Sequence, residues 1–174
     1  MRRTRRPPPR RPAAVLAVSG PSGSGKTRLL SRLIPALVSR GLSVAAVKHT
    51  RHHHALDSPG KDTELLRRAG AAAVAITGPS GTAWFGPEVE TARALARRMG
   101  HVDLVLAEGF RTEPLPRIEV HRRSVPGEFL CATDRRVIAV VSDEPPPRDL
   151  PRLDPEDVAG VAALVVRWLR ARRR

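Results

Sequence analysis

The chain has 174 residues, a formal net charge of +14 at pH 7 and a single cysteine, Cys131. This length is typical of one domain with a hydrophobic core of its own. One cysteine excludes an internal disulfide and a zinc site built from cysteines, and no apolar run approaches the roughly 18 residues of a membrane-spanning helix. We therefore expect a folded protein of the reducing cytoplasm.

The positive charge is concentrated at the two ends of the chain. Six arginines lie in residues 1–12 and five in residues 167–174, which leaves 20 of the 31 basic residues against 17 acidic ones elsewhere. Because the remainder is nearly neutral, the charge does not indicate a nucleic-acid-binding protein. We expect a disordered Pro/Arg-rich tail over residues 1–12, one folded domain over residues 13–170 and a basic tail over residues 171–174.

Short apolar runs alternate along the chain with segments of helical periodicity. The apolar runs predict strands at residues 13–18, 44–48, 72–77, around Trp84, and at 104–107, 118–120 and 137–141. Helices are predicted at residues 26–39, 62–69 and 89–99, and a last helix at residue 154, where Asp154 and Pro155 suit the first positions. This alternation predicts an α/β fold in which helices flank a mostly parallel sheet. The ligand site of such a fold lies at the carboxyl ends of the strands.

One loop carries a motif for binding phosphate. Its sequence is Gly20-Pro21-Ser22-Gly23-Ser24-Gly25-Lys26-Thr27. It fits the pattern G-x-x-x-x-G-K-[ST] between a predicted strand and a predicted helix, which is the context that gives the pattern its meaning. The glycines let backbone amides turn toward phosphate oxygens, Lys26 reaches the outer phosphates, and the Thr27 hydroxyl binds magnesium. We therefore predict a three-layer P-loop NTPase fold.

A carboxylate is expected to complete the magnesium site. The predicted strand at residues 104–107 delivers Glu108 at its carboxyl end, whereas Asp103 lies at the opposite end of the same strand. Gly109 follows and leaves room for phosphate. Glu108 is therefore the candidate acid on the metal side of the site.

A second group of candidates follows the strand at residues 44–48. Lys48 and His49 end that strand, and Asp57 and Lys61 lie in the polar loop that follows, where they would respond to the terminal phosphate as a switch region does. The histidines of this stretch offer an alternative, a zinc or nickel site, although their spacing matches no helical metal-binding pair. These histidines are His49, His52, His53 and His54.

The sequence gives a weaker indication of which residues would bind the base of the nucleotide. The Asn-Lys-x-Asp element of many GTPases is excluded because the chain has no asparagine. Asp143, directly after a buried strand, offers a carboxylate to the N1 and N2 donors of guanine. A simple turn before the prolines at residues 145–147 explains the same residue equally well.

Several stretches together resemble the molybdopterin-guanine dinucleotide biosynthesis protein B family. They are Gly20 to Thr27, Val47-Lys48-His49-Thr50, Asp57-Ser58-Pro59-Gly60-Lys61-Asp62, Arg68-Ala69-Gly70-Ala71, Asp103-Leu104-Val105-Leu106-Ala107-Glu108-Gly109-Phe110 and Pro116-Arg117-Ile118-Glu119-Val120-His121-Arg122. The resemblance runs from about Val15 to Asp143. It implies a homodimeric P-loop protein that binds GTP and Mg²⁺, hydrolyses GTP weakly and assists the guanylyltransferase that attaches GMP to molybdopterin. Molybdopterin is a further candidate ligand.

The chain departs from this family at some positions. His53 and Ala55 stand where further acids are usual, although Asp57, the candidate catalytic residue, keeps its place. Three alternatives remain: a small-molecule kinase, for which Arg122 and Arg123 are candidate lid residues, a nickel-insertion GTPase, and a nucleic-acid-binding ATPase. The leading hypothesis is a GTP-binding adapter in molybdenum cofactor biosynthesis.

Overall fold

The computed structural model describes residues 12–50, 62–79, 81–86 and 88–173. The chain divides into two compact units. The first combines the residues up to His49 with those from Thr91 onward, and the second is formed by Thr50–Glu90. The tail predicted over residues 1–12 lies almost wholly outside the described residues, so its disorder stays a prediction.

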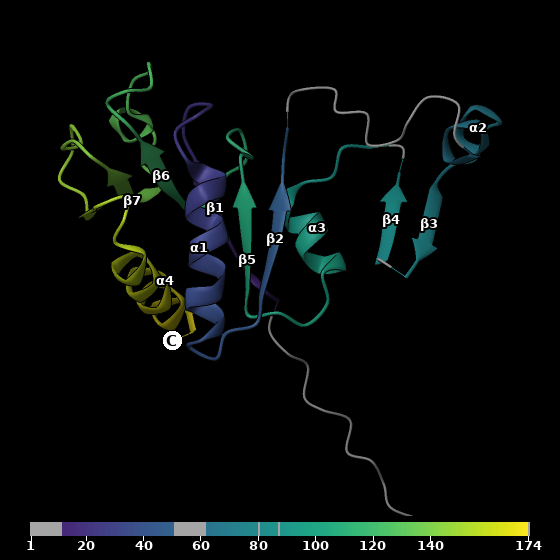
Figure 1. Cartoon of the computed structure of the whole chain (residues 1–174), viewed down its shortest axis with the longest axis horizontal. Coiled ribbons are helices and arrows are strands. Elements are labelled where there is room, and N and C mark those ends of the chain that lie inside the picture. Colours follow the sequence, from purple (N-terminus) through teal and green to yellow (C-terminus); the bar gives the residue numbers. More distant parts are fainter. Residues whose placement is uncertain (1–11, 51–61, 80, 87, 174) are drawn as a thin grey trace, which may run out of the picture. The chain divides into compact units, whose positions relative to one another are not determined.

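A parallel sheet forms the centre of the first unit. Within the described residues its strands are β1 (Ala14–Ser19), β2 (Val44–Lys48), β5 (Leu104–Glu108), β6 (Arg117–His121), β7 (Val137–Ser142) and β8 (Arg152–Leu153). They lie in the order β2-β5-β1-β6-β7-β8, and every pairing is parallel. The predicted parallel sheet is confirmed, and its strands therefore end at one edge, as Figure 1 shows for β2 and β5.

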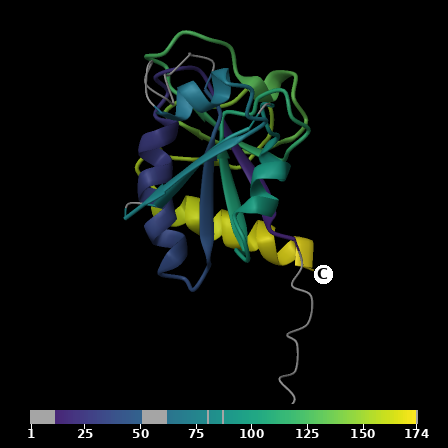
Figure 2. The ribbon, with the colours of Figure 1, turned by 90° about the vertical axis from the view of Figure 1, so that its right-hand side faces the viewer.

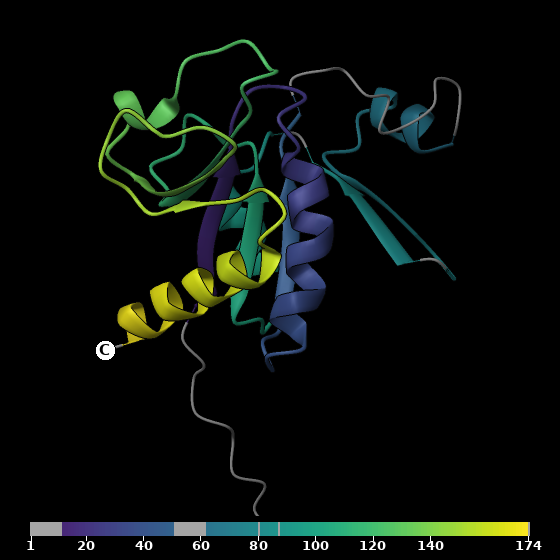
Figure 3. The same ribbon diagram turned by 60° about the vertical axis from the view of Figure 1, so that its left-hand side comes forward.

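Helices cover both faces of this sheet. Those of the first unit are α1 (Lys26–Val38), α3 (Ala92–Arg98) and α4 (Val158–Arg173). Successive side chains of a strand point to opposite faces of the sheet. Leu16 and Val18 of β1 therefore pack in the hydrophobic core on the face covered by α1 and α4, and Ala17 packs in a second core on the face covered by α3. Figure 3 shows α1 and α4 on the same face, and Figure 2 shows α1 and α3 on opposite sides of the strands. The predicted three-layer α/β fold is confirmed.

The second unit is small. It contains α2 (Asp62–Arg68) and the antiparallel pair β3 (Val74–Gly78) and β4 (Gly81–Phe85). The Arg67 guanidinium lies over the Phe85 ring, 5.8 Å from its centroid. Four large apolar side chains of this unit remain about half exposed, namely Leu65, Leu66, Ile76 and Trp84. A two-stranded ribbon with so little burial is marginally stable by itself.

Two helices begin later than the sequence predicts. The helix predicted from residue 89 begins at Ala92, because the Thr91 hydroxyl accepts a hydrogen bond from the Ala94 amide (3.1 Å) and acts as the N-cap. The last helix begins at Val158 instead of residue 154. Asp154 instead closes a turn on the Glu156 amide (2.8 Å), and Asp157 accepts a bond from the Gly160 amide (2.8 Å). An aspartate side chain does accept a hydrogen bond in the first turn of this helix, as predicted, but the aspartate is Asp157 and not Asp154.

Helix α1 fixes the direction of the glycine loop that precedes it. Its buried side chains are Leu29, Leu30, Leu33 and Leu37, which anchor it to the sheet, and Pro35 lies within it. This packing aims the N-terminus of α1, and the amides there, at the carboxyl edge of the strands. No helix in the described ranges has both the length and the apolar character that crossing a bilayer requires.

Candidate phosphate and metal site

The glycine loop joins the end of β1 to the start of α1, as the sequence predicts. Gly20, Gly23 and Gly25 have φ values of 151°, 79° and 92°, a region that residues with a Cβ atom rarely adopt. At Gly20 the backbone of β6 is also very close, because a Cβ atom there would lie 2.1 Å from the Val120 carbonyl oxygen. The loop is therefore folded tightly against the neighbouring strand.

Ser24 supplies an independent sign of an anion site in this loop. Its side chain is fully buried, and its hydroxyl has no hydrogen-bond partner among the described residues. A buried hydroxyl without a partner is unfavourable. A phosphate oxygen held by the loop amides would satisfy it, so this residue fits the ligand that the motif predicts.

Lys26 folds back on its own loop. Its ammonium donates hydrogen bonds to the carbonyl oxygens of Gly20 (3.1 Å) and Pro21 (2.5 Å). Burial lowers the pKa of this lysine, the Glu108 carboxylate partly offsets that effect, and the Lys48 ammonium adds to it. The positive charge is thus held at the mouth of the loop, where the outer phosphates of a nucleotide would lie.

The structure brings Thr27 and Glu108 into direct contact. The Thr27 hydroxyl lies 2.8 Å and 2.9 Å from the two Glu108 carboxylate oxygens, to which it donates. The pairing of β5 with β1 produces this contact, since Glu108 lies beside Val18 in the register. A hydroxyl and a carboxylate at this position are the oxygen ligands that Mg²⁺ prefers. The donor set therefore fits the predicted metal.

Lys48 lies at the same place, and His49 takes a different position. The Lys48 ammonium lies 3.0 Å from Glu108 Oε1 and donates a hydrogen bond to Thr27 Oγ1 (3.3 Å). The His49 amide donates to the Glu108 carbonyl oxygen (2.9 Å), and its ring packs against Phe110, with centroids 5.4 Å apart. His49 therefore supports the backbone at the end of β5 rather than the Thr27–Glu108 pair.

Asp143 lies where the sequence predicts, at the carboxyl end of β7. Its Oδ1 atom accepts a hydrogen bond from the Arg123 amide (2.9 Å). That bond lowers the pKa of the carboxyl group, and the charges of Arg122 and Arg123 lower it further. The carboxylate is exposed and charged at neutral pH, which suits a group that accepts hydrogen bonds from a ligand.

Arg122 is a candidate whose position the sequence did not predict. Its Nη1 atom donates to the carbonyl oxygens of His121 (3.0 Å) and Val141 (3.4 Å). Its Nη2 atom lies 3.6 Å from the place that a Cβ atom on Gly25 would occupy. The sequence indicates this arginine only as a candidate lid residue. Its place beside the glycine loop follows from the pairing of β6 with β1, which the sequence does not specify.

Three polar residues of β6 are buried and bind other protein groups. The Arg117 Nε atom lies 3.2 Å from Asp134 Oδ2, and Glu119 accepts hydrogen bonds from the amides of residues 130 and 131 (2.6 Å and 2.8 Å). The His121 ring lies 2.9 Å from Glu144 Oε1. These contacts tie β6 to the segments beside β7, so this stretch of the family pattern has a structural explanation.

The remaining predicted residues lie outside the described part of the chain. They are Asp57 and Lys61 of the switch region and the histidines His52, His53 and His54. Within the described residues, no group of three or more histidine, cysteine or acidic side chains is placed to hold a metal ion. The histidine cluster of the nickel alternative therefore stays a prediction.

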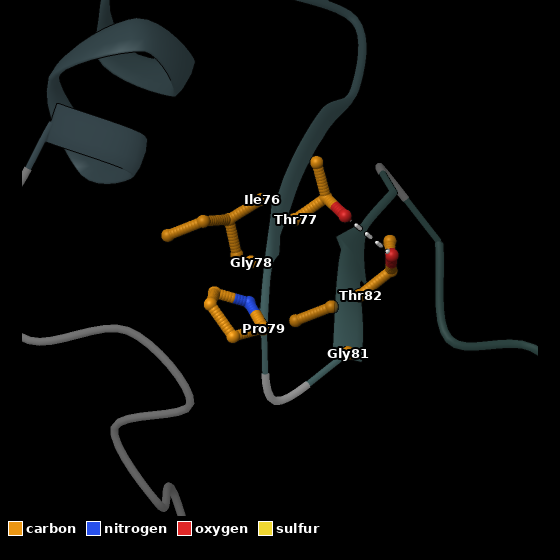
Figure 4. Close-up of a pocket in the computed structure, with 7 residues that line it drawn as sticks. Ile76, Thr77, Gly78, Pro79, Gly81 and Thr82 are labelled. Atoms are coloured by element: carbon orange, nitrogen blue, oxygen red, sulfur yellow. Dashed lines mark hydrogen bonds between the residues drawn. The ribbon is translucent and has the colours of Figure 1, made fainter.

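A shallow hollow lies on the β3–β4 hairpin of the second unit. Residues 76–79 and 81–83 line it, and the Thr82 hydroxyl donates to the Thr77 hydroxyl (3.0 Å), as Figure 4 shows. Among the described residues that line it there is no charged side chain and no residue of the glycine loop. The hollow therefore lacks the chemistry for binding phosphate.

A glycine loop between a buried parallel strand and a helix, with a hydroxyl and a carboxylate at its mouth, defines a P-loop protein. The family model described as MobB, molybdopterin guanine dinucleotide synthesis protein B, matches residues 15–143. The chain therefore belongs to the MobB family, and the resemblance noted in the sequence is confirmed.

Individual relatives agree with this assignment. The chain is 42% identical over 164 residues to the molybdopterin-guanine dinucleotide biosynthesis adapter protein of Escherichia coli K12, covering 89% of this chain and 93% of the relative. The protein of the same description from Haemophilus influenzae is 35% identical, with 89% of each chain covered. A crystal structure of molybdopterin-guanine biosynthesis protein B superposes with a TM-score of 0.67 at 28% identity, covering 90% of this chain and 99% of the other.

Proposed function

We propose that this protein is a GTP-binding adapter in the biosynthesis of molybdopterin guanine dinucleotide. The observation that carries the proposal is the contact of Thr27 with Glu108 beside a complete glycine loop, in a chain of the MobB family. Relatives that the chain matches over nearly their whole length are described as adapter proteins of this pathway. The nucleotide site then serves an assisting role, and the transfer of GMP belongs to a guanylyltransferase partner.

The proposed ligand is GTP with Mg²⁺. The loop amides, the buried Ser24 hydroxyl and the Lys26 ammonium would bind the phosphates, and Thr27 with Glu108 would hold the metal, which neutralises phosphate charge. Arg122 adds a guanidinium close to Gly25. These groups bind and orient the nucleotide, and Asp57 is the proposed residue for the slow hydrolysis step.

Guanine recognition is assigned to Asp143. A carboxylate with two acceptor oxygens matches the two donors on the Watson–Crick edge of guanine, whereas adenine presents an acceptor at N1. β7 is the second strand from β1 on the side of β6. This topology puts Asp143 at the same edge of the sheet as the glycine loop, as a base-binding residue requires.

A second copy of the chain is the proposed partner of the second unit. Ile76 and Trp84 lie on neighbouring strands of the hairpin and remain 53% and 52% exposed. Ile76 pairs with Ala83 and Trp84 with Ala75, so the two side chains lie on opposite faces of the hairpin. Aromatic side chains such as that of Trp84 are enriched where protein surfaces associate. A homodimer that covers the Trp84 face would also stabilise this ribbon, which is too small to be stable alone. We place this dimer in the cytoplasm, with the guanylyltransferase as its enzyme partner.

Calorimetric titration with non-hydrolysable GTP and ATP analogues, each in magnesium, tests the nucleotide assignment. We expect saturable binding of the GTP analogue and at least tenfold weaker binding of the ATP analogue. Asp143→Asn should reduce that preference, because an amide presents only one acceptor oxygen to guanine. Equal affinity for the two analogues would refute guanine specificity, and no binding of either would refute the site.

A further inference from the structure

The Lys48 ammonium contacts both candidate metal ligands. It lies 3.0 Å from Glu108 Oε1 and donates to the Thr27 hydroxyl at 3.3 Å. The two partners differ in exposure, since the Glu108 side chain is only 10% exposed and the Lys48 side chain is 57% exposed. A carboxylate so deeply buried requires a compensating charge. The lysine supplies that charge from the solvent side.

Strand pairing determines which lysine takes this position. Lys48 lies directly beside Glu108 in the register of β2 with β5. Lys26, the other nearby lysine, donates its hydrogen bonds to carbonyl oxygens of the loop instead. The ion pair with Glu108 within the described residues is therefore made by Lys48, a residue outside the glycine motif.

A metal ion and this ammonium compete for the same two oxygens. Mg²⁺ binds its oxygen ligands at about 2.0–2.1 Å, and a hydroxyl that ligates a metal must present a lone pair to it. The Thr27 hydroxyl instead donates to Glu108 and accepts from Lys48. An ammonium 3.0 Å from Glu108 and 3.3 Å from Thr27 leaves no room for a divalent ion between them.

We propose that Lys48 is a built-in cation that neutralises the Thr27–Glu108 pair before nucleotide binds and is displaced when the metal–nucleotide complex enters. The inference rests on the proposed function, because it assumes that these residues hold the metal. Lys48 then raises the metal concentration that the site requires. Its release also frees, next to the phosphates, a positive side chain at the end of the strand that leads to the second unit.

Binding of manganese to the protein saturated with GDP tests this proposal. Mn²⁺ takes the same oxygen ligands as Mg²⁺ and its free form is counted by electron paramagnetic resonance. GDP is used because it lacks the terminal phosphate that a released lysine would contact. We expect Lys48→Met to bind Mn²⁺ roughly fivefold more tightly than the wild type, an effect the size of one partly exposed ion pair.

Arg28→Met is the matched control, since it removes one positive charge next to Thr27 in the chain, while the Arg28 guanidinium pairs with Glu156 (3.0 Å) and not with Thr27 or Glu108. Its Mn²⁺ affinity should change less than twofold. Equal Mn²⁺ affinity in the wild type and Lys48→Met would overturn the proposal, as would an equal gain in both variants, which would indicate a general effect of charge. A wild type that does not bind GDP with metal would instead refute the proposed function.

Thermal unfolding without nucleotide gives a second measurement. Lys48→Met should unfold at a lower temperature than the wild type, because Glu108 loses its compensating charge, and Mn²⁺ with GDP should remove most of this difference. Lys48→Gln, which keeps a donor, should behave in the same direction. If both variants stayed unfolded or equally destabilised with metal and GDP present, Lys48 would be a structural residue and not a displaceable cation.

Discussion

Replacing Gly20 with alanine is expected to destabilise the protein far more than the same change elsewhere in the glycine loop. The new Cβ atom would lie 2.1 Å from the Val120 carbonyl oxygen, which is backbone and cannot rotate away, and the φ of 151° is unfavourable for alanine. The backbone strain costs about 1–2 kcal/mol and the overlap about 1–3 kcal/mol more. The expected loss of about 2–5 kcal/mol corresponds to a melting temperature lower by roughly 10 °C for a chain of this length.

Gly23→Ala is the control for this experiment. Gly23 also has a positive φ, of 79°, but no atom of the described residues lies within 4 Å of its Cβ position. Only the backbone strain applies, so the expected loss is about 1–2 kcal/mol and the melting temperature falls by roughly 3–5 °C. Circular dichroism measured against temperature compares the two variants. Equal melting temperatures would show that the loop is not packed against β6 as described.

Four further predictions concern the site, the core and the second unit. Lys26→Ala should reduce GTP affinity at least a hundredfold in calorimetry and leave the circular dichroism spectrum unchanged; unchanged affinity in the folded variant would refute the site. Glu108→Gln should raise the magnesium concentration for half-maximal GTP binding about tenfold, whereas an unchanged requirement would remove Glu108 from the metal site. Burial, with the nearby charge of Glu119, raises the pKa of the Cys131 thiol to about 11 from 9.0. As the pH rises, the unfolded chain therefore loses the thiol proton before the folded chain does, so the free energy of unfolding should fall between about pH 9 and about pH 11. Denaturant titrations should show a smaller fall for Cys131→Ala than for the wild type. An equal fall in the two proteins would contradict the raised pKa of Cys131. Trp84→Asp should convert the proposed homodimer to monomer in sedimentation experiments, and a variant that stays dimeric would place the dimer interface elsewhere.

Local patterns were enough to predict the glycine loop and most of the strands. The loop motif spans eight consecutive residues, and its conformation depends mainly on its own glycines and on the strand and helix that it joins. The strand at residues 104–107 was equally clear, because its apolar run ends at a charged residue, and the structure extends it by that residue, Glu108. Features that depend on residues adjacent in the sequence could therefore be predicted from it.

Features that depend on the order of the strands in the sheet could not be predicted from the sequence. β5 lies between β1 and β2, so Lys48 and Glu108 become neighbours although 60 residues separate them. The proximity of Arg122 to Gly25 likewise depends on β6 lying beside β1. The predicted start of the last helix was wrong for a different reason. Asp154 and Asp157 are equally good caps by composition, and turn geometry decides between them.

The insertion of β5 between β1 and β2 also determines when the site can form during synthesis. The bond from Thr27 to Glu108 joins residues 81 positions apart, and the chain in between includes the whole second unit. The entropic cost of closing a loop rises only slowly with its length, so the length of this loop is a small penalty. The bond nevertheless cannot form until β5 has emerged from the ribosome. A nascent chain shorter than about 108 residues thus has the glycine loop without its carboxylate. Metal-dependent nucleotide binding would then report that β5 has joined the sheet between β1 and β2, and a ribosome-bound chain of increasing length should acquire it in one step.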